Sequence, residues 1–108
     1  MNYYFTDEWG DQKELAENSL IVVCYNLDGK IDELISEIRR KEEIDEVILV
    51  DNASLDNTLT ELSKRTCDIE QPSLLIGLEY HIPFVSARNI GLGYATGTSI
   101  SAMSFEKE

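Results

Sequence analysis

The sequence predicts one α/β domain, in which a mainly parallel sheet is covered by helices on both faces. Four short apolar stretches alternate with three segments in which apolar residues recur at the helical period. This β-α-β-α-β-α-β order implies right-handed crossovers between parallel strands. The length of 108 residues leaves room for a single domain. A further helix is expected to precede the first strand.

The predicted strands are apolar runs bounded by turn residues, as expected of strands that are buried on both faces. They are residues 19–25, 46–50, 73–77 and 98–103. The predicted helices lie between them, at residues 30–41, 56–66 and 83–97. Pro83 suits the first turn of the third helix, and Gly97 is expected to end it.

The first predicted helix has the clearest pattern. Its apolar residues fall at i, i+3, i+4 and i+7, and they are Ile31, Leu34, Ile35 and Ile38. Most other positions are charged, so one stripe should face the sheet and the rest should face water. Asp28 is expected to cap this helix, and Ser54 and Asp56 are expected to cap the second.

Residues 1–18 form a separate extension in this interpretation, and residues 19–108 form the domain. Four of the nine aromatic residues and five acidic residues lie in the extension. A helix over residues 6–17 would pack the aromatic side chains onto the domain. Alternatively, they present a surface for a partner or for self-association.

The composition describes an acidic globular chain. With 21 acidic and 9 basic side chains the net charge is −12, so neither nucleic acid nor an anionic membrane surface is expected as a partner. No apolar stretch is long enough to cross a bilayer, and no signal-peptide pattern is present. Cys24 and Cys67 cannot form a disulfide framework, and a reducing, cytoplasmic location fits them. Cys24 lies in an apolar run and is expected to be a buried thiol rather than a nucleophile.

Polar residues follow the first two predicted strands at the edge where parallel sheets bind ligands. They are Tyr25, Asn26, Asp51, Asn52 and Ser54. The loop after the first strand lacks the G-x-G-x-x-G of dinucleotide-binding domains and the acidic pair of phosphoacceptor domains, and no P-loop is present. The dinucleotide-binding, P-loop and phosphoacceptor folds are therefore excluded.

Three segments in order carry a more specific pattern. They are L-I-V-V-C-Y-N at residues 20–26, V-I-L-V-D-N-A-S-L-D-N-T at residues 47–58 and V-S-A-R-N-I-G-L-G-Y-A-T-G at residues 85–97. Together they resemble the donor-binding half of the family 2 glycosyltransferases, which have the Rossmann-like GT-A fold. The resemblance implies a truncated GT-A unit that holds a nucleotide-diphosphate sugar, such as a UDP- or dTDP-sugar.

The resemblance also implies roles for single residues. Tyr25 would pack against the base or ribose, and Asp51 would accept a hydrogen bond from the imide N–H of a uracil-type base. Arg88 would supply positive charge near the base and phosphate. Asn26 and Asn52 would complete the nucleotide site. Asn89 would fix the loop rather than contact the ligand.

Each of these residues also has a purely structural interpretation. Tyr25 could be a half-exposed core residue, and Asp51 and Asn52 could form only a turn. Arg88 could pair with a surface carboxylate. His81, which lies in the loop before Pro83, is expected to be a solvated loop residue.

The pattern departs from the family at its metal motif. Where the family has Asp-x-Asp, which binds Mg²⁺ or Mn²⁺, this sequence has Ser104, Phe105 and Glu106. Glu106 is at most a weak remnant of that site, so no cofactor is predicted with certainty. The loop at Ile82, Pro83 and Phe84 also lacks the family's usual Asn and Gly.

The expected function is therefore donor binding without transfer, because the acceptor half and its catalytic base would be missing. Nucleotide binding should be weak, near millimolar or about −4 kcal/mol, and insensitive to manganese. Two other interpretations stay open. The chain could be an interaction domain that forms homo-oligomers through an open sheet edge or its N-terminal segment, or one part of a split transferase completed by another chain.

Overall fold

The computed structural model describes residues 3–6, 12–15 and 17–106, and a four-stranded parallel sheet lies at its centre. The strand order is β5-β4-β3-β6, and all three neighbouring pairs are parallel. The strands are β3 (Asn18–Tyr25), β4 (Glu46–Asp51), β5 (Ser73–Gly77) and β6 (Ser99–Glu106). The predicted parallel α/β fold is confirmed, and the last strand continues past the predicted end to Glu106.

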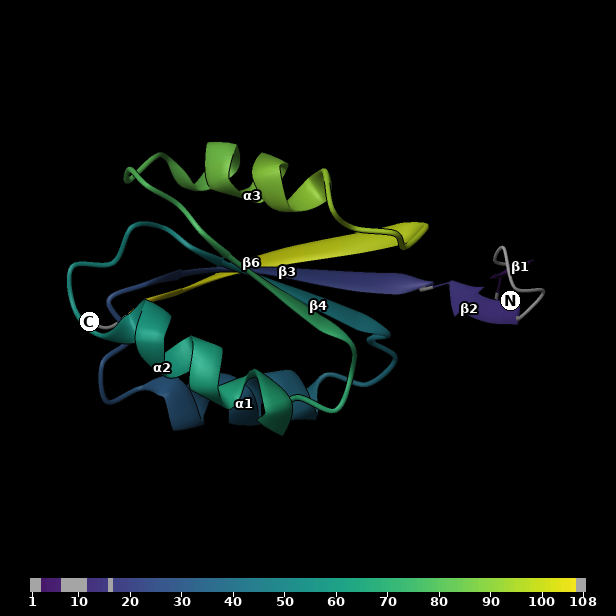
Figure 1. The fold of residues 1–108 in the computed structure, drawn as a ribbon, viewed down its shortest axis with the longest axis horizontal. Helices are drawn as coiled ribbons and strands as arrows, with labels where there is room; N and C mark the ends of the chain where they lie inside the picture. Colours follow the sequence, from purple (N-terminus) through teal and green to yellow (C-terminus); the bar gives the residue numbers. More distant parts are fainter. Residues whose placement is uncertain (1–2, 7–11, 16, 107–108) are drawn as a thin grey trace.

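Helices cover both faces of this sheet (Figure 1). They are α1 (Ile31–Arg40), α2 (Thr58–Arg65) and α3 (Phe84–Leu92), with a short 3-10 helix, η1 (Thr66–Asp68), after α2. Figure 1 shows α1 and α2 on one face and α3 on the other. Within the described residues, none of the helices has the length and hydropathy needed to cross a membrane.

The central strand β3 contributes to two cores because its side chains alternate between the faces. Leu20, Val22 and Cys24 pack with α1 and α2, whereas Ile21 and Val23 pack on the α3 side. The predicted apolar stripe of α1 is buried in the first core, and its members are Ile31, Leu34, Ile35 and Ile38. The period read from the sequence therefore identified the buried face of this helix.

The two cysteines lie in contrasting environments. Cys24 is fully buried, and that burial raises the pKa of its thiol, with a smaller contribution from the Asp51 carboxylate. The thiol therefore stays protonated and serves as a core side chain, as predicted. Cys67 is exposed in η1, and both cysteines are free.

The predicted N-terminal helix over residues 6–17 is wrong. The structure has an antiparallel pair of strands, β1 (Tyr3–Thr6) and β2 (Gln12–Leu15), with Tyr3 opposite Leu15. Three of the four residues of β1 are aromatic and the fourth is β-branched, and such residues favour strands. Residues 7–11 and 16 of the predicted helix lie outside the described residues. The division of the chain at residue 18 stays a prediction.

Two predicted helix ends also differ from the structure. No side chain caps α1, which begins after Lys30, so the predicted Asp28 cap is wrong. The N–H of Asp28 instead donates to the Asp56 carboxylate at 3.1 Å, and this bond ties the loop to the one after β4. The helix α3 ends at Leu92 rather than near Gly97, because the N–H of Gly93 closes its last turn.

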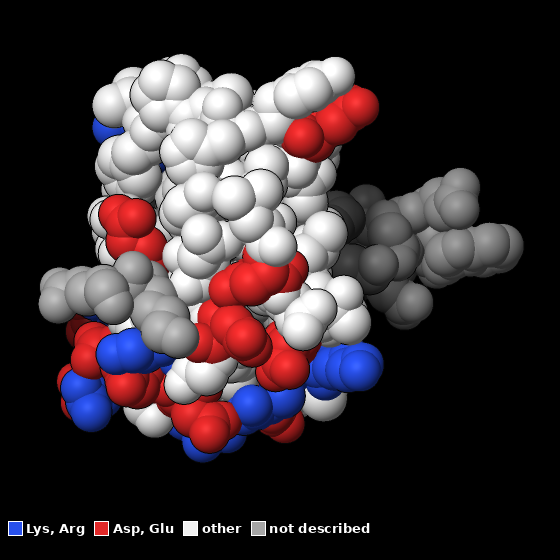
Figure 2. Space-filling model, turned by 90° about the vertical axis from the view of Figure 1, so that its left-hand side faces the viewer, with Lys and Arg blue, Asp and Glu red and all other residues white. Residues whose placement is uncertain are grey.

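Charged side chains are unevenly distributed over the two layers. In Figure 2, which faces the carboxyl ends of the strands, Lys and Arg side chains gather over the lower part of the molecule, where α1 and α2 lie. From Tyr80 to Phe105, the stretch that forms α3 and nearly all of β6, Arg88 is the only formally charged residue. The α3 layer is therefore close to neutral in a strongly acidic chain.

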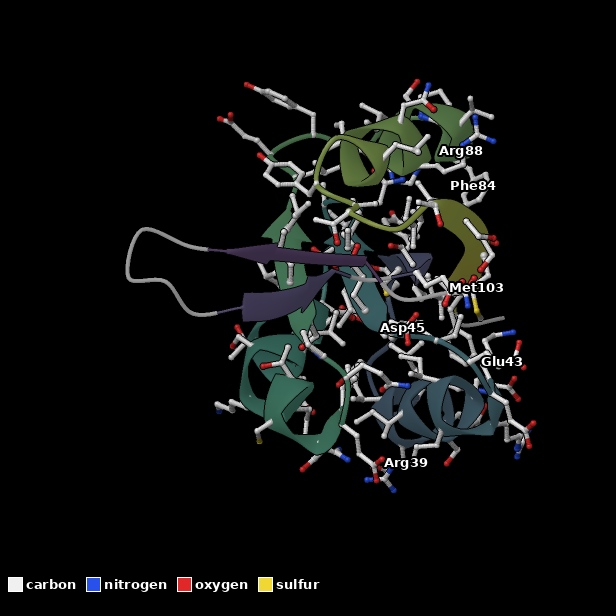
Figure 3. The ribbon with its side chains drawn as sticks, turned by 90° about the vertical axis from the view of Figure 1, so that its right-hand side faces the viewer. Arg39, Glu43, Asp45, Phe84, Arg88 and Met103 are labelled. Carbon is white, nitrogen blue, oxygen red and sulfur yellow. The ribbon has the colours of Figure 1, made fainter. Side chains whose placement is uncertain are left out.

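Two adjacent acidic residues organise the amino end of the sheet. The Asp45 carboxylate accepts the N–H groups of Glu17 and Asn18 at 3.0 and 2.8 Å, and Figure 3 shows Asp45 at this end. The Glu46 carboxylate accepts the Ser19 hydroxyl at 2.5 Å and the Thr96 N–H at 2.6 Å. These bonds join the start of β3, the start of β4 and the loop that leads into β6.

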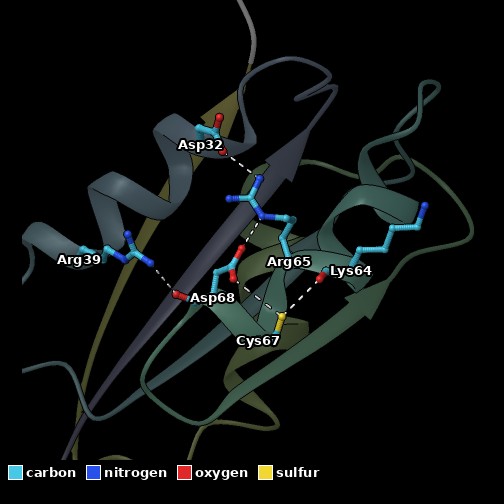
Figure 4. A network of polar contacts seen from close by, with 6 residues as sticks. All are labelled: Asp32, Arg39, Lys64, Arg65, Cys67 and Asp68. Carbon is cyan, nitrogen blue, oxygen red and sulfur yellow. Dashed lines mark hydrogen bonds and ion pairs between the residues drawn. The ribbon is translucent and has the colours of Figure 1, made fainter.

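A polar network joins the two helices of the lower layer (Figure 4). The Arg65 guanidinium pairs with Asp68 in η1 and with Asp32 on α1, at 2.5 and 2.8 Å. Arg39 of α1 donates to the Asp68 carbonyl at 3.2 Å. The hydrogen bond from Arg65 lowers the pKa of the Asp68 carboxyl. Since these groups are largely exposed, the network fixes helix orientation more than it adds stability.

The contact at Gly97 predicts an unequal pair of glycine substitutions. A Cβ at Gly97 would lie 2.4 Å from Ser19 Oγ and 2.9 Å from its nitrogen, so Gly97→Ala should lower the free energy of unfolding by about 1–3 kcal/mol. The control is Gly93→Ala, where the nearest atom is the Ile90 carbonyl oxygen at 3.4 Å and the backbone is helical. This control should be neutral or stabilise by up to about 1 kcal/mol. Urea unfolding measures both, and equal losses would contradict the packing argument.

The Glu46 network predicts a pH dependence of stability. Burial of the Glu46 carboxyl opposes its ionisation, but the hydrogen bonds from Ser19 and Thr96 outweigh burial and lower the pKa. A lowered folded-state pKa gives stability that is complete above the unfolded value of about 4.3 and is lost as the pH falls through the folded value. Glu46→Gln should remove this part of the acid dependence. Urea unfolding between pH 7 and pH 3 tests it, and an unchanged acid slope in Glu46→Gln would disprove the assignment.

Candidate functional site

The carboxyl ends of β3 and β4 bring four of the predicted site residues together. Cys24 and Asp51 are register partners in this parallel pair, so Tyr25 and Asn26 leave β3 beside the point where Asp51 and Asn52 end β4. Parallel strands place all their carboxyl ends at one edge. The sequence-predicted site residues of these two loops are therefore neighbours in space.

A cleft of about 140 Å³ opens at this edge. Its wall includes Tyr25, Asn52 and three residues of the loop before α3, and the full lining is Val23, Tyr25, Asn52, His81, Ile82, Pro83, Phe84, Ser104 and Glu106. The rings of Tyr25 and His81 are in contact, with centroids 4.4 Å apart and planes tilted by 56°. The cleft thus presents two aromatic rings beside polar side chains, a combination that suits a planar polar ligand.

Asn52 holds the loop that closes the cleft. Its side-chain amide donates to the Ile82 carbonyl at 2.7 Å, and its Oδ1 accepts the Ile82 N–H at 3.0 Å. Its own carbonyl lies 3.0 Å from Nδ1 of His81. Since a carbonyl can only accept, Nδ1 of His81 is the donor in this contact. Asn52 is 4% exposed and acts here as a clamp between two loops.

Asp51 and Asn26 lock the other two loops of the site to each other. The Asp51 carboxylate is 1% exposed and accepts the hydroxyl and N–H of Ser54 at 2.5 and 3.3 Å. Ser54 Oγ accepts the Asn26 N–H at 2.9 Å, and Asn26 Oδ1 accepts the Leu55 N–H at 2.8 Å. Asn26 and Ala53 have φ values of 50° and 57°. Asn tolerates this left-handed conformation, which makes the turn after β3 possible.

Of the two predicted caps of α2, Asp56 binds the first turn and Ser54 does not. Asp56 Oδ1 accepts the N–H of Thr58 at 2.9 Å and also binds the Thr58 hydroxyl. Burial opposes ionisation of Asp56, but the bonds from Thr58 outweigh it and lower the pKa. Ser54 instead bridges Asp51 and Asn26, as described above.

Arg88 does not line the Tyr25 cleft. It lies in a second groove of about 330 Å³ with Ile21, Phe84, Leu92, Ile100 and Ala102, and Phe84 is common to both hollows. Figure 3 shows Arg88 and Phe84 on the side of α3 that overlooks β6. Its Nη2 donates to Asn89 Oδ1 at 3.2 Å, whereas its buried Nε has no hydrogen-bond partner in the described part of the chain.

The residues at the end of β6 do not fit a divalent cation. Glu106 is the register partner of Tyr25 and lines the cleft, together with Ser104. One exposed carboxylate and one hydroxyl are a poor donor set for Mg²⁺ or Mn²⁺, which favour several oxygen ligands and carboxylates above all. Within the described residues, no group of three His, Cys, Asp or Glu side chains is placed to hold a metal ion.

Three cleft residues carry roles that the sequence analysis missed. His81 was expected to be a solvated loop residue, whereas its exposed ring packs on Tyr25 and its Nδ1 contacts the Asn52 carbonyl. Ile82 and Phe84 were considered only as departures from a family pattern. Their position after β5, whose carboxyl end lies at the same edge of the sheet, was the available signal.

Comparisons with known proteins agree with this architecture. The family model described as glycosyl transferase family 2 matches residues 19–103. Among solved structures, the crystal structure of S. aureus TarS is similar, with a TM-score of 0.67 and 26% identity, over 82% of this chain and 16% of that one. No curated protein matches. Since the family model covers most of the chain, the protein belongs to glycosyl transferase family 2.

Proposed function

We propose that this chain binds the nucleoside part of a nucleotide-sugar donor, such as a UDP- or dTDP-sugar, in the Tyr25 cleft. The supporting observation is the pair of aromatic rings, Tyr25 and His81, beside an amide clamp at the carboxyl edge of a family 2 sheet. A planar base can pack on an aromatic ring while its polar edge meets loop groups.

The proposal divides the five predicted residues into three groups. Tyr25 and Asn52 line the cleft and would contact the base directly. Asp51 and Asn26 hold the loops in place. The Asp51 carboxylate is 1% exposed, binds Ser54 and does not line the cleft, so the role of imide acceptor would require the loop that carries Ser54 to move. Arg88 lies beyond Phe84 and would meet the phosphates only from the neighbouring groove.

The size and charge of the cleft favour weak binding. A volume of 140 Å³ is below the range of about 300–1,000 Å³ that is typical of ligand sites, so the cleft would enclose a base but leave the diphosphate outside. None of the residues that line it is a Lys or Arg, and the chain carries a net charge of −12. We therefore propose a dissociation constant near 1 mM, or about −4 kcal/mol.

We propose further that the residues described here bind a donor without transferring its sugar. Transfer needs an acceptor hydroxyl, a base that deprotonates it and stabilisation of the leaving diphosphate. The Tyr25 cleft holds neither a cation set nor a Lys or Arg for the diphosphate. The chain spans about a sixth of the TarS chain, so a larger or split transferase that supplies the other groups is compatible with the proposal.

A cytoplasmic location and the absence of a nucleic-acid partner stay part of the proposal. Both cysteines are free, which fits a reducing compartment. The acidic surface disfavours binding to another polyanion.

An NMR titration with UDP tests the site. Shifts are expected at Tyr25, Asn52 and His81, with the same affinity in the presence and absence of Mg²⁺. Tyr25→Leu should weaken binding about 5- to 100-fold, because base–aromatic stacking contributes about 1–3 kcal/mol. The control is Tyr94→Leu, which removes a tyrosine that is 58% exposed and lies outside the cleft. Absence of shifts at these residues in 10 mM UDP would refute the nucleotide site.

Removal of the Asn52 clamp should affect stability and binding together. Asn52→Ala breaks both hydrogen bonds to Ile82 and leaves the half-buried N–H and carbonyl of Ile82 without these partners, at a cost of about 1–3 kcal/mol. The freed loop should also lower UDP affinity. Asn57→Ala is the control, because Asn57 is exposed and makes no side-chain cap bond to α2. Urea unfolding and the same titration measure the two effects, and Asn52→Ala behaving like Asn57→Ala would contradict the clamp.

A further inference from the structure

His81 is the one histidine in the sequence, and its ring stands at the rim of the Tyr25 cleft. The exposure of the lining residues shows how deep each one lies. Val23 and Asn52 are each 4% exposed and form the floor, whereas His81 and Glu106 are exposed. A base that reaches the floor would leave its ribose and phosphates at the rim. His81 is therefore placed beside the charged part of a bound nucleotide sugar.

Two contacts fix the His81 ring. It packs on Tyr25 with 4.4 Å between the ring centroids, and its Nδ1 donates to the Asn52 carbonyl at 3.0 Å. A ring that already carries a proton on Nδ1 gains its second proton at Nε2. Both the neutral ring and the imidazolium can make the Nδ1 contact, so protonation would add a charge without breaking this bond.

The surroundings of His81 leave such a charge unpaired. The ionisable residues that the bordering strands, loop and helix place nearest to the cleft are Tyr25, Asp51, Glu79, Tyr80, Arg88 and Glu106. Asp51 is bound by Ser54, and Arg88 lies in the neighbouring groove. Among the described residues, Glu106 is the one carboxylate that lines the cleft, no Lys or Arg lines it, and His81 forms no ion pair.

We propose that protonated His81 binds the diphosphate of the nucleotide sugar at the rim of the cleft. The imidazolium donates from Nε2 to a phosphate oxygen, and such a charge-assisted hydrogen bond is stronger than one between neutral groups. The inference rests on the proposed function and deepens it, because it assigns the phosphate contact to His81. Donor affinity should rise as the pH falls, since histidine is the side chain that ordinarily gains a proton between pH 8 and pH 5.

NMR titration with UDP-glucose at pH 7.5 and pH 5.5 tests the proposal. Each phosphate of this probe keeps a single negative charge over this range, because neither has a second ionisable proton. The affinity should be about fivefold higher at pH 5.5, the ratio expected of one additional charge pair in water. Uridine, which has no phosphate, should bind equally at both pH values.

Three variants assign the effect to the His81 charge. In His81→Asn the new amide can still donate to the Asn52 carbonyl but carries no charge, so UDP-glucose affinity should become equal at both pH values. His81→Lys is charged throughout and should bind UDP-glucose at pH 7.5 at least as tightly as the unmodified chain does at pH 5.5. Tyr94→Lys is the control for added charge and should change affinity less than twofold, because Tyr94 is 58% exposed and lies outside the cleft. Circular dichroism verifies that each variant folds.

The ring signals of His81 give a second readout, since no other histidine in the sequence overlaps with them. Linkage requires that a ligand bound more tightly by the protonated ring also favours protonation. A fivefold affinity ratio corresponds to a rise of about 0.7 in the pH at which the ring is half protonated, on saturation with UDP-glucose. Saturation with uridine should leave this pH unchanged.

The outcomes separate this inference from the function on which it rests. If uridine and UDP-glucose both bind and neither responds to pH, the nucleoside site stands and the role of His81 is refuted. Tighter binding of UDP-glucose at pH 7.5, or an undiminished pH response in His81→Asn, would refute it as well. If neither compound shifts the signals of Tyr25 and Asn52 at 10 mM at either pH, the nucleoside site is refuted and the inference falls with it.

Discussion

The burial of β3 is the constraint on which the rest of the structure depends. This strand pairs with β4 on one edge and β6 on the other, and residues 19–24 are buried. A parallel neighbour on each side requires a crossover for each connection, so helices must cover both faces. Tyr25 is the first residue of β3 to emerge from the core. Its position beside Asp51 and Asn52 is therefore a consequence of the pairing rather than of local preference.

The two helical layers have different surface chemistry. The α1 and α2 layer, with the residues that flank these two helices, carries six of the nine Lys and Arg residues, some of them in exposed pairs such as Arg65 with Asp32 and Arg40 with Glu37. Exposed pairs add little stability, and their main effect is a well-solvated surface. The α3 layer instead exposes apolar side chains around the single cation Arg88. Contact with another molecule is therefore least costly on the α3 side, where the Tyr25 cleft and the groove that contains Arg88 both lie.

Strand and helix periods made most of the fold predictable. The apolar run from Leu20 to Cys24 predicts a strand that is covered on both faces. The apolar stripe of α1 predicts an amphipathic helix. The N-terminal hairpin was missed because its second strand, Gln12–Leu15, is mostly polar and has no period of its own. This segment is a strand because it pairs with β1, and four residues of sequence do not indicate which strand they will pair with.

The candidate site was predictable only in part, for a related reason. Strand ends can be located from the sequence, so Tyr25 and Asp51 could be placed at the ligand edge. The clamp between Asn52 and Ile82 spans 30 residues and depends on how the loop after β5 returns over the sheet. The direction of Arg88 depends on the rotation of α3 about its axis, which Gly91 sets through close contact with Ile21 and Val50. The residue type of Arg88 suggested a contact with phosphate, but the hollow that its side chain lines could be identified only from the structure.

The Tyr25 cleft and the Arg88 groove share Phe84 and one strand. Phe84 borders both hollows, and β6 contributes Ser104 and Glu106 to the cleft and Ile100 and Ala102 to the groove. Alternate residues of a strand lie on one face, so all four of these side chains lie on the α3 side of the sheet. A change in the position of Phe84 or of β6 therefore alters both hollows at once, and the nucleoside cleft cannot be reshaped without affecting the surroundings of Arg88.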